Sequence, residues 1–133
     1  MKFKNLFVVD DDKIYHFLFK NLLKQNKIDI KSTFFGNGQD AIDFMKGNND
    51  QENLPDLILL DVNMPIMNGW LFLEEYLKIK KELVKLPVIY MISSSNNEVD
   101  ISKAKEFTGV VSDYFLKPIC KEDLEKIFIN EAY

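Results

Sequence analysis

The chain has 133 residues, a net charge of −4, and a composition that is 47% hydrophobic and 29% charged. This length fits one domain with a substantial hydrophobic core. The lysines are scattered and arginine is absent, so we expect no basic stripe for nucleic acid. The longest apolar runs, of about five residues, are too short to cross a membrane. The single cysteine excludes an internal disulfide, and we expect a cytoplasmic location.

Two kinds of segment alternate along the chain. Short apolar or β-branched segments predict strands at Leu6–Asp10, Ile30–Phe35, Leu57–Asp61, Val88–Ser93 and Val110–Leu116. Each is followed by a segment of helical length, and the predicted helices are Ile14–Gln25, Gln39–Lys46, Trp70–Lys81, Val99–Phe107 and Lys121–Ile129. The order is therefore strand then helix, five times over.

Several single residues carry structural expectations. In the first helix, Ile14, Leu18 and Leu22 recur at four-residue spacing. Asp12 lies just before that helix, where a carboxylate complements the helix dipole. Cys120 is expected to pack beside the last helix. Six phenylalanines are expected to pack in the core: Phe17, Phe19, Phe34, Phe35, Phe44 and Phe72. The only histidine, His16, is expected to have a surface or packing role.

The strands are almost continuously apolar, which indicates burial on both faces. A parallel sheet covered by helices on both sides satisfies that requirement, so we predict an α/β fold with a doubly wound, five-stranded parallel sheet and five helices. One such arrangement has the strand order 2-1-3-4-5. Its ligands bind beyond the carboxyl ends of the strands, at the switch between strands 1 and 3.

Polar residues gather at these carboxyl ends. Asp10 and Asp11 end the first strand, and Asp61 ends the third. Ser93 ends the fourth strand, and Lys117 follows the fifth. In the 2-1-3-4-5 order, all of these ends face one shallow cleft.

Three carboxylates in one cleft repel one another. Two unit charges about 4 Å apart cost roughly 4 kcal/mol at an effective dielectric constant of 20. A divalent cation removes this cost, and an all-oxygen site favours a hard ion, so we predict Mg²⁺ bound by Asp10, Asp11 and Asp61. The main-chain carbonyl of Asn63 is a further candidate ligand.

The same cleft suggests phosphoryl chemistry. An aspartate carboxylate can attack phosphorus, and Asp61 is the candidate. Mg²⁺ would neutralise phosphoryl oxygens during transfer. Lys117 would pair with one phosphoryl oxygen, and the Ser93 hydroxyl would donate a hydrogen bond to another.

These motifs together resemble the receiver domain of two-component response regulators, of the stand-alone chemotaxis type. The resemblance covers essentially the whole chain and rests on VVDDD, LLDVNMPIMNG, the hydroxyl that ends the fourth strand, and DYFLKP. It implies a flavodoxin-like fold in which Asp61 is the phosphoacceptor. It further implies that Asp10, Asp11 and the Asn63 main chain help to hold Mg²⁺.

The resemblance also implies a switch. Ser93 would be the switch hydroxyl, although Ser94 remains an alternative because the fourth strand has one more apolar residue than usual. Tyr114 would change rotamer on activation, and the Lys117–Pro118 bond would be cis. A partner would recognise the face formed by the fourth helix, the fifth strand and the fifth helix.

The functional expectation is a single receiver domain over residues 1–133 with no output domain. A histidine kinase or phosphotransfer protein would phosphorylate it, and it would signal to a separate protein. It would not be an enzyme with an outside substrate. Two alternatives are a phosphatase of the haloacid dehalogenase type, whose Asp-x-Asp motif residues 10–12 match, and a receiver-like binding module that is not phosphorylated.

Overall fold

The computed structural model of the chain describes residues 3–48, 50–94 and 98–129. One parallel sheet contains β1 (Asn5–Val9), β2 (Lys31–Phe35), β3 (Leu57–Asp61), β4 (Val88–Ser93) and β5 (Val111–Leu116). The strands lie in the order β2-β1-β3-β4-β5, and all four pairings are parallel. The predicted topology is therefore confirmed, and it brings the carboxyl ends of β1 and β3 side by side.

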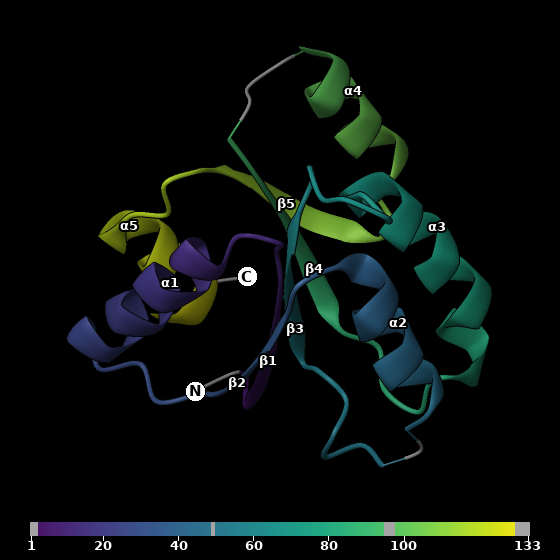
Figure 1. The fold of residues 1–133 in the computed structure, drawn as a ribbon, viewed down its shortest axis with the longest axis horizontal. Helices are drawn as coiled ribbons and strands as arrows, with labels where there is room; N and C mark the ends of the chain where they lie inside the picture. The colour runs from purple at the N-terminus through teal and green to yellow at the C-terminus, as the bar shows by residue number, and fades with distance from the viewer. Residues whose placement is uncertain (1–2, 49, 95–97, 130–133) are drawn as a thin grey trace.

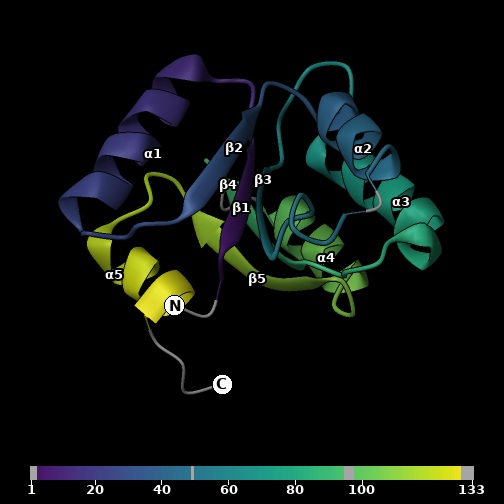
Figure 2. The same cartoon turned by 90° about the horizontal axis from the view of Figure 1, so that it is seen from below.

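Helices cover both faces of this sheet (Figures 1 and 2). Their bounds are α1 (Lys13–Gln25), α2 (Gly38–Lys46), α3 (Gly69–Ile79), α4 (Glu98–Glu106) and α5 (Lys121–Leu124). Helices α1 and α5 pack on one face, and α2, α3 and α4 lie on the other. The fold is thus the doubly wound, flavodoxin-like α/β fold that was predicted.

The largest differences from the predicted elements are at two helix ends. Helix α3 ends at Ile79 and a 3₁₀ turn, Lys80–Glu82, follows it. Helix α5 is regular only from Lys121 to Leu124, and Glu125–Ile129 continues it as a π-helical segment. Such changes of winding at helix ends leave no mark in the spacing of apolar residues.

The core explains why β1 and β3 are so apolar. Every residue of both strands is buried, and their side chains alternate between the two layers of helices. Phe7 and Ile58 pack toward the α2–α3 side, whereas Leu6 and Leu59 pack toward the α1–α5 side. Asp61 is thereby fixed at the end of a strand that is buried on both faces.

Helix α1 buries a different stripe from the one that its four-residue spacing picked out. Phe19 and Leu23 face the core, whereas Ile14 is 71% exposed and Leu18 is 58% exposed. The expected core role of Phe17 is wrong, because this residue is 63% exposed.

Two smaller expectations also change. Phe44 is partly exposed at the edge of the core, where its ring contacts Phe7 and Phe35. Cys120 is exposed rather than packed, because it lies at the N-terminal end of α5, where its amide donates to Asp123 Oδ2 at 3.0 Å.

Among the described residues, none of the helices combines the length and apolarity needed to span a bilayer.

Candidate phosphorylation site

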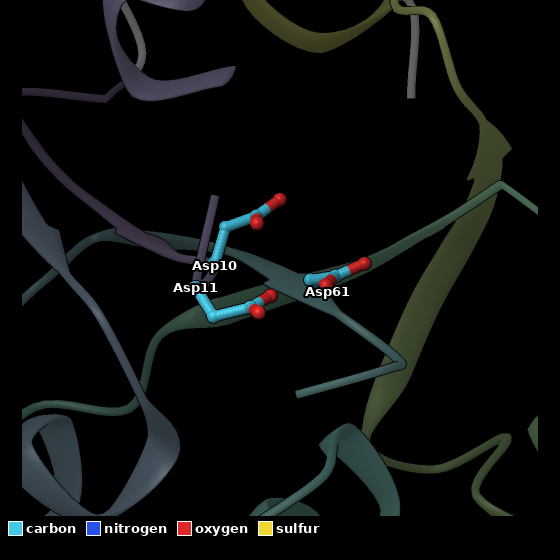
Figure 3. Close-up of side chains that lie close together, drawn as sticks. All are labelled: Asp10, Asp11 and Asp61. Carbon is cyan, nitrogen blue, oxygen red and sulfur yellow. The ribbon is translucent and has the colours of Figure 1, made fainter. Parts of the chain in front are cut away.

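Three carboxylates meet at the carboxyl ends of β1 and β3 (Figure 3). Asp10 and Asp11 follow β1, and Asp61 is the last residue of β3. One oxygen from each lies within 4.8 Å of the others. Asp10 and Asp61 are buried, with 2% and 6% of their surface exposed, whereas Asp11 is exposed. The predicted acidic cluster therefore exists, with two buried carboxylates and one exposed to solvent.

Backbone contacts hold Asp10 in place. Its amide donates to the Phe35 carbonyl at 3.0 Å, which ties it to the end of β2. Its Oδ1 accepts from the Asp12 amide at 2.9 Å. Asp12 in turn caps α1, since its Oδ1 accepts from the amides of Ile14 and Tyr15 at 2.9 and 3.3 Å. The capping role predicted for Asp12 is confirmed, and it links the start of α1 to the site.

Asp61 is held by the sheet and by the start of α3. Asp61 pairs with Ile92 of β4, and the Gly69 amide donates to the Val62 carbonyl at 2.8 Å. The Asn68 side chain caps α3 by accepting from the Leu71 amide at 2.9 Å. These contacts hold the first turn of α3 in contact with the end of β3.

Lys117 places a positive charge between the carboxylates. Its Nζ donates to Asp10 Oδ2 at 2.7 Å and lies 3.4 Å from Asp61 Oδ1. Its amide donates to the Ser93 carbonyl at 2.8 Å, which fixes its backbone against the end of β4. The Lys117–Pro118 bond is cis, as the resemblance implied.

The electrostatics of the site follow from this packing. Burial raises the pKa of the Asp61 carboxyl, the charge of Asp10 raises it further, and the opposing effect of Lys117 leaves the pKa at about 6. Burial alone would lower the pKa of Lys117, but the hydrogen bond to Asp10 and the charges of Asp10 and Asp61 outweigh it and raise the pKa. Three carboxylates thus face one ammonium, and the cluster remains short of positive charge.

This deficit fits a divalent cation. Three carboxylate oxygens within reach of one another, two of them desolvated, form the hard oxygen set that Mg²⁺ or Mn²⁺ prefers. Asn63 follows Asp61 by two residues and is exposed, so its main-chain oxygen remains a predicted ligand. The chemistry of the donors is therefore compatible with the predicted metal.

The two candidate switch hydroxyls differ in their environment. Ser93 is the last residue of β4 and is completely buried, whereas Ser94 is exposed. Tyr114 lies on β5 opposite Met91 and is half-buried. It lines a groove between α4 and β5 together with Ala104, Lys105, Thr108, Val111, Asp113 and Leu116.

Sequence reasoning missed two residues of α1 that contact the site. The Nε2 of His16 lies 2.6 Å from the Asp10 carbonyl oxygen, and its ring packs on Phe34. The Tyr15 ring lies under the Lys117 ammonium, 4.4 Å from Nζ to the ring centre. Only the position of these two residues in the sequence could have predicted these contacts. They lie in the first turn of a helix that closely follows β1, and that turn must lie beside the carboxyl end of the strand.

Comparison with known proteins agrees with this geometry. The sequence matches the family described as the response regulator receiver domain over residues 6–129. Since the match spans almost the whole chain, the protein belongs to the response-regulator receiver family. This membership favours the receiver interpretation over the phosphatase alternative.

Two relatives and two solved structures show how similar this chain is to known response regulators and how much of each protein the similarity covers. Response regulator Rcp1 of Synechocystis is 32% identical over 126 residues, which are 93% of this chain and 83% of Rcp1. Regulatory protein LuxO of Vibrio vulnificus is 29% identical over 94% of this chain, but the match spans only 24% of LuxO. A two-component response regulator from Cytophaga hutchinsonii superposes with a TM-score of 0.83 at 24% identity, covering 96% of both chains. The Mn²⁺-bound form of Rcp1 gives a TM-score of 0.68 at 30% identity, covering 93% of this chain and 88% of Rcp1.

Proposed function

We propose that this receiver domain accepts a phosphoryl group on Asp61 from a histidine kinase or a histidine phosphotransfer protein, with Mg²⁺ as cofactor. One observation carries the proposal: the Lys117 ammonium contacts Asp10 and lies 3.4 Å from Asp61, at the open ends of the strands. A buried carboxylate beside a cation has the charge arrangement that a phosphoryl-accepting nucleophile needs.

The proposed step is a displacement at phosphorus. A carboxylate oxygen of Asp61 forms a new O–P bond while the P–N bond of the donor phosphohistidine breaks. The electron pair of that bond stays on the imidazole nitrogen, which then takes a proton from water. Lys117 pairs with one phosphoryl oxygen, and the Ser93 hydroxyl donates to another. Water later attacks the acyl phosphate, which returns the Asp61 carboxylate and inorganic phosphate.

The acidic cluster supports a role for Mg²⁺. Asp10, Asp11 and Asp61 would hold the ion, with the Asn63 main chain as a further ligand. Bound there, the ion neutralises charge on the phosphoryl oxygens. The crystallised Mn²⁺-bound form of the related Rcp1 supports this assignment.

The proposed output is a change of shape on the α4–β5–α5 face. Phosphorylation adds about −1.5 to −2 charge and three acceptor oxygens, toward which Ser93 moves. Tyr114 then turns inward behind it, and a separate downstream protein recognises the altered face. The half-buried Tyr114 and the groove that it lines between α4 and β5 support this route.

A cytoplasmic location stays a prediction. We further propose that the protein turns over no outside substrate. Steady hydrolysis of p-nitrophenyl phosphate by wild type, abolished by Asp61→Asn, would instead favour the phosphatase alternative. Release of one p-nitrophenolate per molecule, followed by turnover no faster than hydrolysis of the acyl phosphate on Asp61, agrees with the receiver.

The decisive experiment is the intact mass of the protein after incubation with Mg²⁺ and acetyl phosphate or phosphoramidate. Wild type should gain one phosphoryl group, and Asp61→Asn should gain none. Asp29→Asn, an exposed aspartate before β2, is the matched control and should be phosphorylated like wild type. The gain should disappear with EDTA. No gain with any donor would favour the unphosphorylated binding module.

A further inference from the structure

Tyr15 lies where α1 meets the phosphorylation site. It belongs to the first turn of α1, and its ring stacks on Phe19 with ring centres 5.9 Å apart and planes inclined by 18°. Tyr15 lines a groove between α1 and the segment after β5, and the other side of this groove is formed by Pro118 and Ile119, the two residues that follow Lys117. The ring is thus fixed beside the segment that carries the site's only ammonium among the described residues.

Lys117 is held from two directions. On one side its ammonium contacts Asp10 and Asp61. On the other side the Tyr15 ring lies 4.4 Å from Nζ, within the range in which an aromatic face attracts a cation. The four-carbon stem of lysine is flexible, and its ammonium is a point charge without a preferred direction. Surrounding groups must therefore decide where the ammonium lies.

The aromatic contact matters most when the carboxylates are engaged elsewhere. Asp10 and Asp61, which Lys117 contacts, belong to the set that would hold a divalent ion. When they coordinate the ion, less of their charge is available to hold Lys117. The Tyr15 ring takes no part in the acidic cluster, so its attraction for the ammonium persists at that stage.

The hydroxyl of Tyr15 does not explain the position of this side chain. It is buried and has no hydrogen-bond partner within the described part of the chain. Burial raises the pKa of this hydroxyl, and the charges of Asp10 and Asp61 raise it further, so it stays protonated. Removing a buried hydroxyl that has no partner relieves an uncompensated desolvation cost, so it should not lower stability. Phenylalanine is therefore a conservative replacement that keeps the ring and its contacts.

We infer that Tyr15 is a positioning residue of the phosphorylation site, whose ring holds the Lys117 ammonium within reach of the group on Asp61. It acts through Lys117 and not by touching the phosphoryl group. The inference rests on the proposed phosphorylation of Asp61 and adds a residue of α1 to that site.

The test compares Tyr15→Phe, which keeps the ring, with Tyr15→Leu, which keeps an apolar side chain without a ring. Leu18→Ala is the matched control, because Leu18 lines the same groove and is largely exposed. The first measurement is the NMR chemical shift of the Lys117 ε-methylene protons, which a ring face moves upfield. Wild type, Tyr15→Phe and Leu18→Ala should share the upfield shift, and Tyr15→Leu should lose it.

The second measurement is the rate of phosphorylation by phosphoramidate at saturating Mg²⁺, followed by intact mass. Tyr15→Leu should be about three- to tenfold slower, the range expected for a cation–π contact. The phosphorylation rates of Tyr15→Phe and Leu18→Ala should stay within about twofold of the wild-type rate. A general disturbance of α1 would instead slow these variants as well.

Three results would overturn the inference: an unchanged Lys117 shift in Tyr15→Leu, an unchanged rate in Tyr15→Leu, or equal slowing in Tyr15→Leu and Tyr15→Phe. The last would assign the effect to the hydroxyl. The NMR comparison needs no phosphoryl group. If wild type accepts none, the proposed function fails, and the chemical shifts still decide whether the ring positions Lys117.

Discussion

A Cβ atom on Gly69 would lie 2.7 Å from the main-chain oxygen of Asp61. Carbon atoms do not approach an oxygen so closely, so the first turn of α3 reaches the end of β3 only because residue 69 has no side chain. The same hypothetical atom would meet the Val62 Cα at 3.0 Å. The position of the candidate phosphoacceptor thus depends directly on a glycine eight residues further along the chain.

Gly69→Ala should therefore displace the main chain at Asp61. We expect a loss of about 1–3 kcal/mol in the free energy of unfolding, as for overpacked cores. Phosphorylation should slow by about tenfold or more, because small displacements of a nucleophile are costly. Urea denaturation and intact mass measure the two effects. Gly36→Ala is the control, since apart from its chain neighbours no atom of the described residues lies within 4 Å of a Cβ there. Similar behaviour of both variants would contradict the prediction.

Asp61→Asn should stabilise the metal-free protein. The pKa of Asp61 is raised from its ordinary value of 3.8 to about 6 in the folded chain. Between these values the folded state binds more protons than the unfolded state, so the free energy of unfolding falls as the pH rises through this window. The substitution removes that loss, and we expect a gain of about 1–3 kcal/mol above pH 6 that shrinks toward pH 4.

Urea denaturation in EDTA at a series of pH values measures this difference. Asp29→Asn, an exposed aspartate, controls for the loss of one carboxylate. Equal or lower stability of Asp61→Asn above pH 6 would mean that neither burial nor the charge of Asp10 disfavours the ionised Asp61 carboxylate in the folded protein.

Mg²⁺ should stabilise the wild-type protein, and Asp11 should be needed for it. A ligand that binds only the folded state adds about 2.7 kcal/mol at a concentration of about 100 times its dissociation constant. Asp11 is the exposed member of the cluster. Asp11→Asn should therefore weaken Mg²⁺ binding by about tenfold or more without loss of metal-free stability. The fluorescence of Trp70, which follows Gly69 at the start of α3, offers a titration signal, and unchanged affinity would remove Asp11 from the site.

The fold could be predicted because strand and helix patterns alternate without interruption. The strand order then placed Asp10, Asp61 and Lys117 together from positions up to 107 residues apart. Helix α1 shows where this reasoning stops. Its sequence, KIYHFLFKNLLKQ, has apolar residues on several faces, so spacing alone does not say which stripe is buried. The way α1 packs on the sheet determines which face is buried, and the buried residues of that face are Phe19 and Leu23.

Contacts made through one side chain were also beyond prediction. The distance from the Tyr15 ring to Lys117 depends on the rotamers of both side chains and on the path of the chain after β5. His16 likewise reaches the Asp10 carbonyl because α1 turns back over the end of β1. Neither relationship produces a periodic pattern. Charged residues at strand ends were easier to predict, because topology alone brings them together.

Ser93→Ala and Ser94→Ala should differ in their effect on phosphorylation. Ser93 is completely buried at the end of β4, beside the backbone contact to Lys117, whereas Ser94 is exposed. Loss of one hydrogen bond to the phosphoryl group should slow Ser93→Ala by about fivefold or more. Ser94→Ala should stay within about twofold. Rates with phosphoramidate measure both, and the reverse order would make Ser94 the switch hydroxyl.

Asp56 should stabilise the opposite end of the sheet without affecting the site. Its Oδ2 accepts from the amides of Lys4 and Asn5, both at 2.8 Å, and its Oδ1 pairs with Lys85 at 3.0 Å. Asp56→Ala should lower the free energy of unfolding by about 2 kcal/mol. Its phosphorylation rate should match wild type, and Asp29→Ala, which removes an exposed aspartate, should change neither quantity.

The contribution of Asp56 should also depend on pH. Burial would raise its pKa, but the hydrogen bonds from Lys85, Lys4 and Asn5 and the charge of Lys85 outweigh burial and lower it. Because the folded-state pKa is lowered, this stabilisation is complete above the unfolded value of 3.8 and is lost as the pH falls through the folded value. The difference in stability between wild type and Asp56→Ala should therefore shrink below pH 4 in urea denaturation. A difference that stays constant down to pH 2 would show that the ionised carboxylate is not what holds these strands.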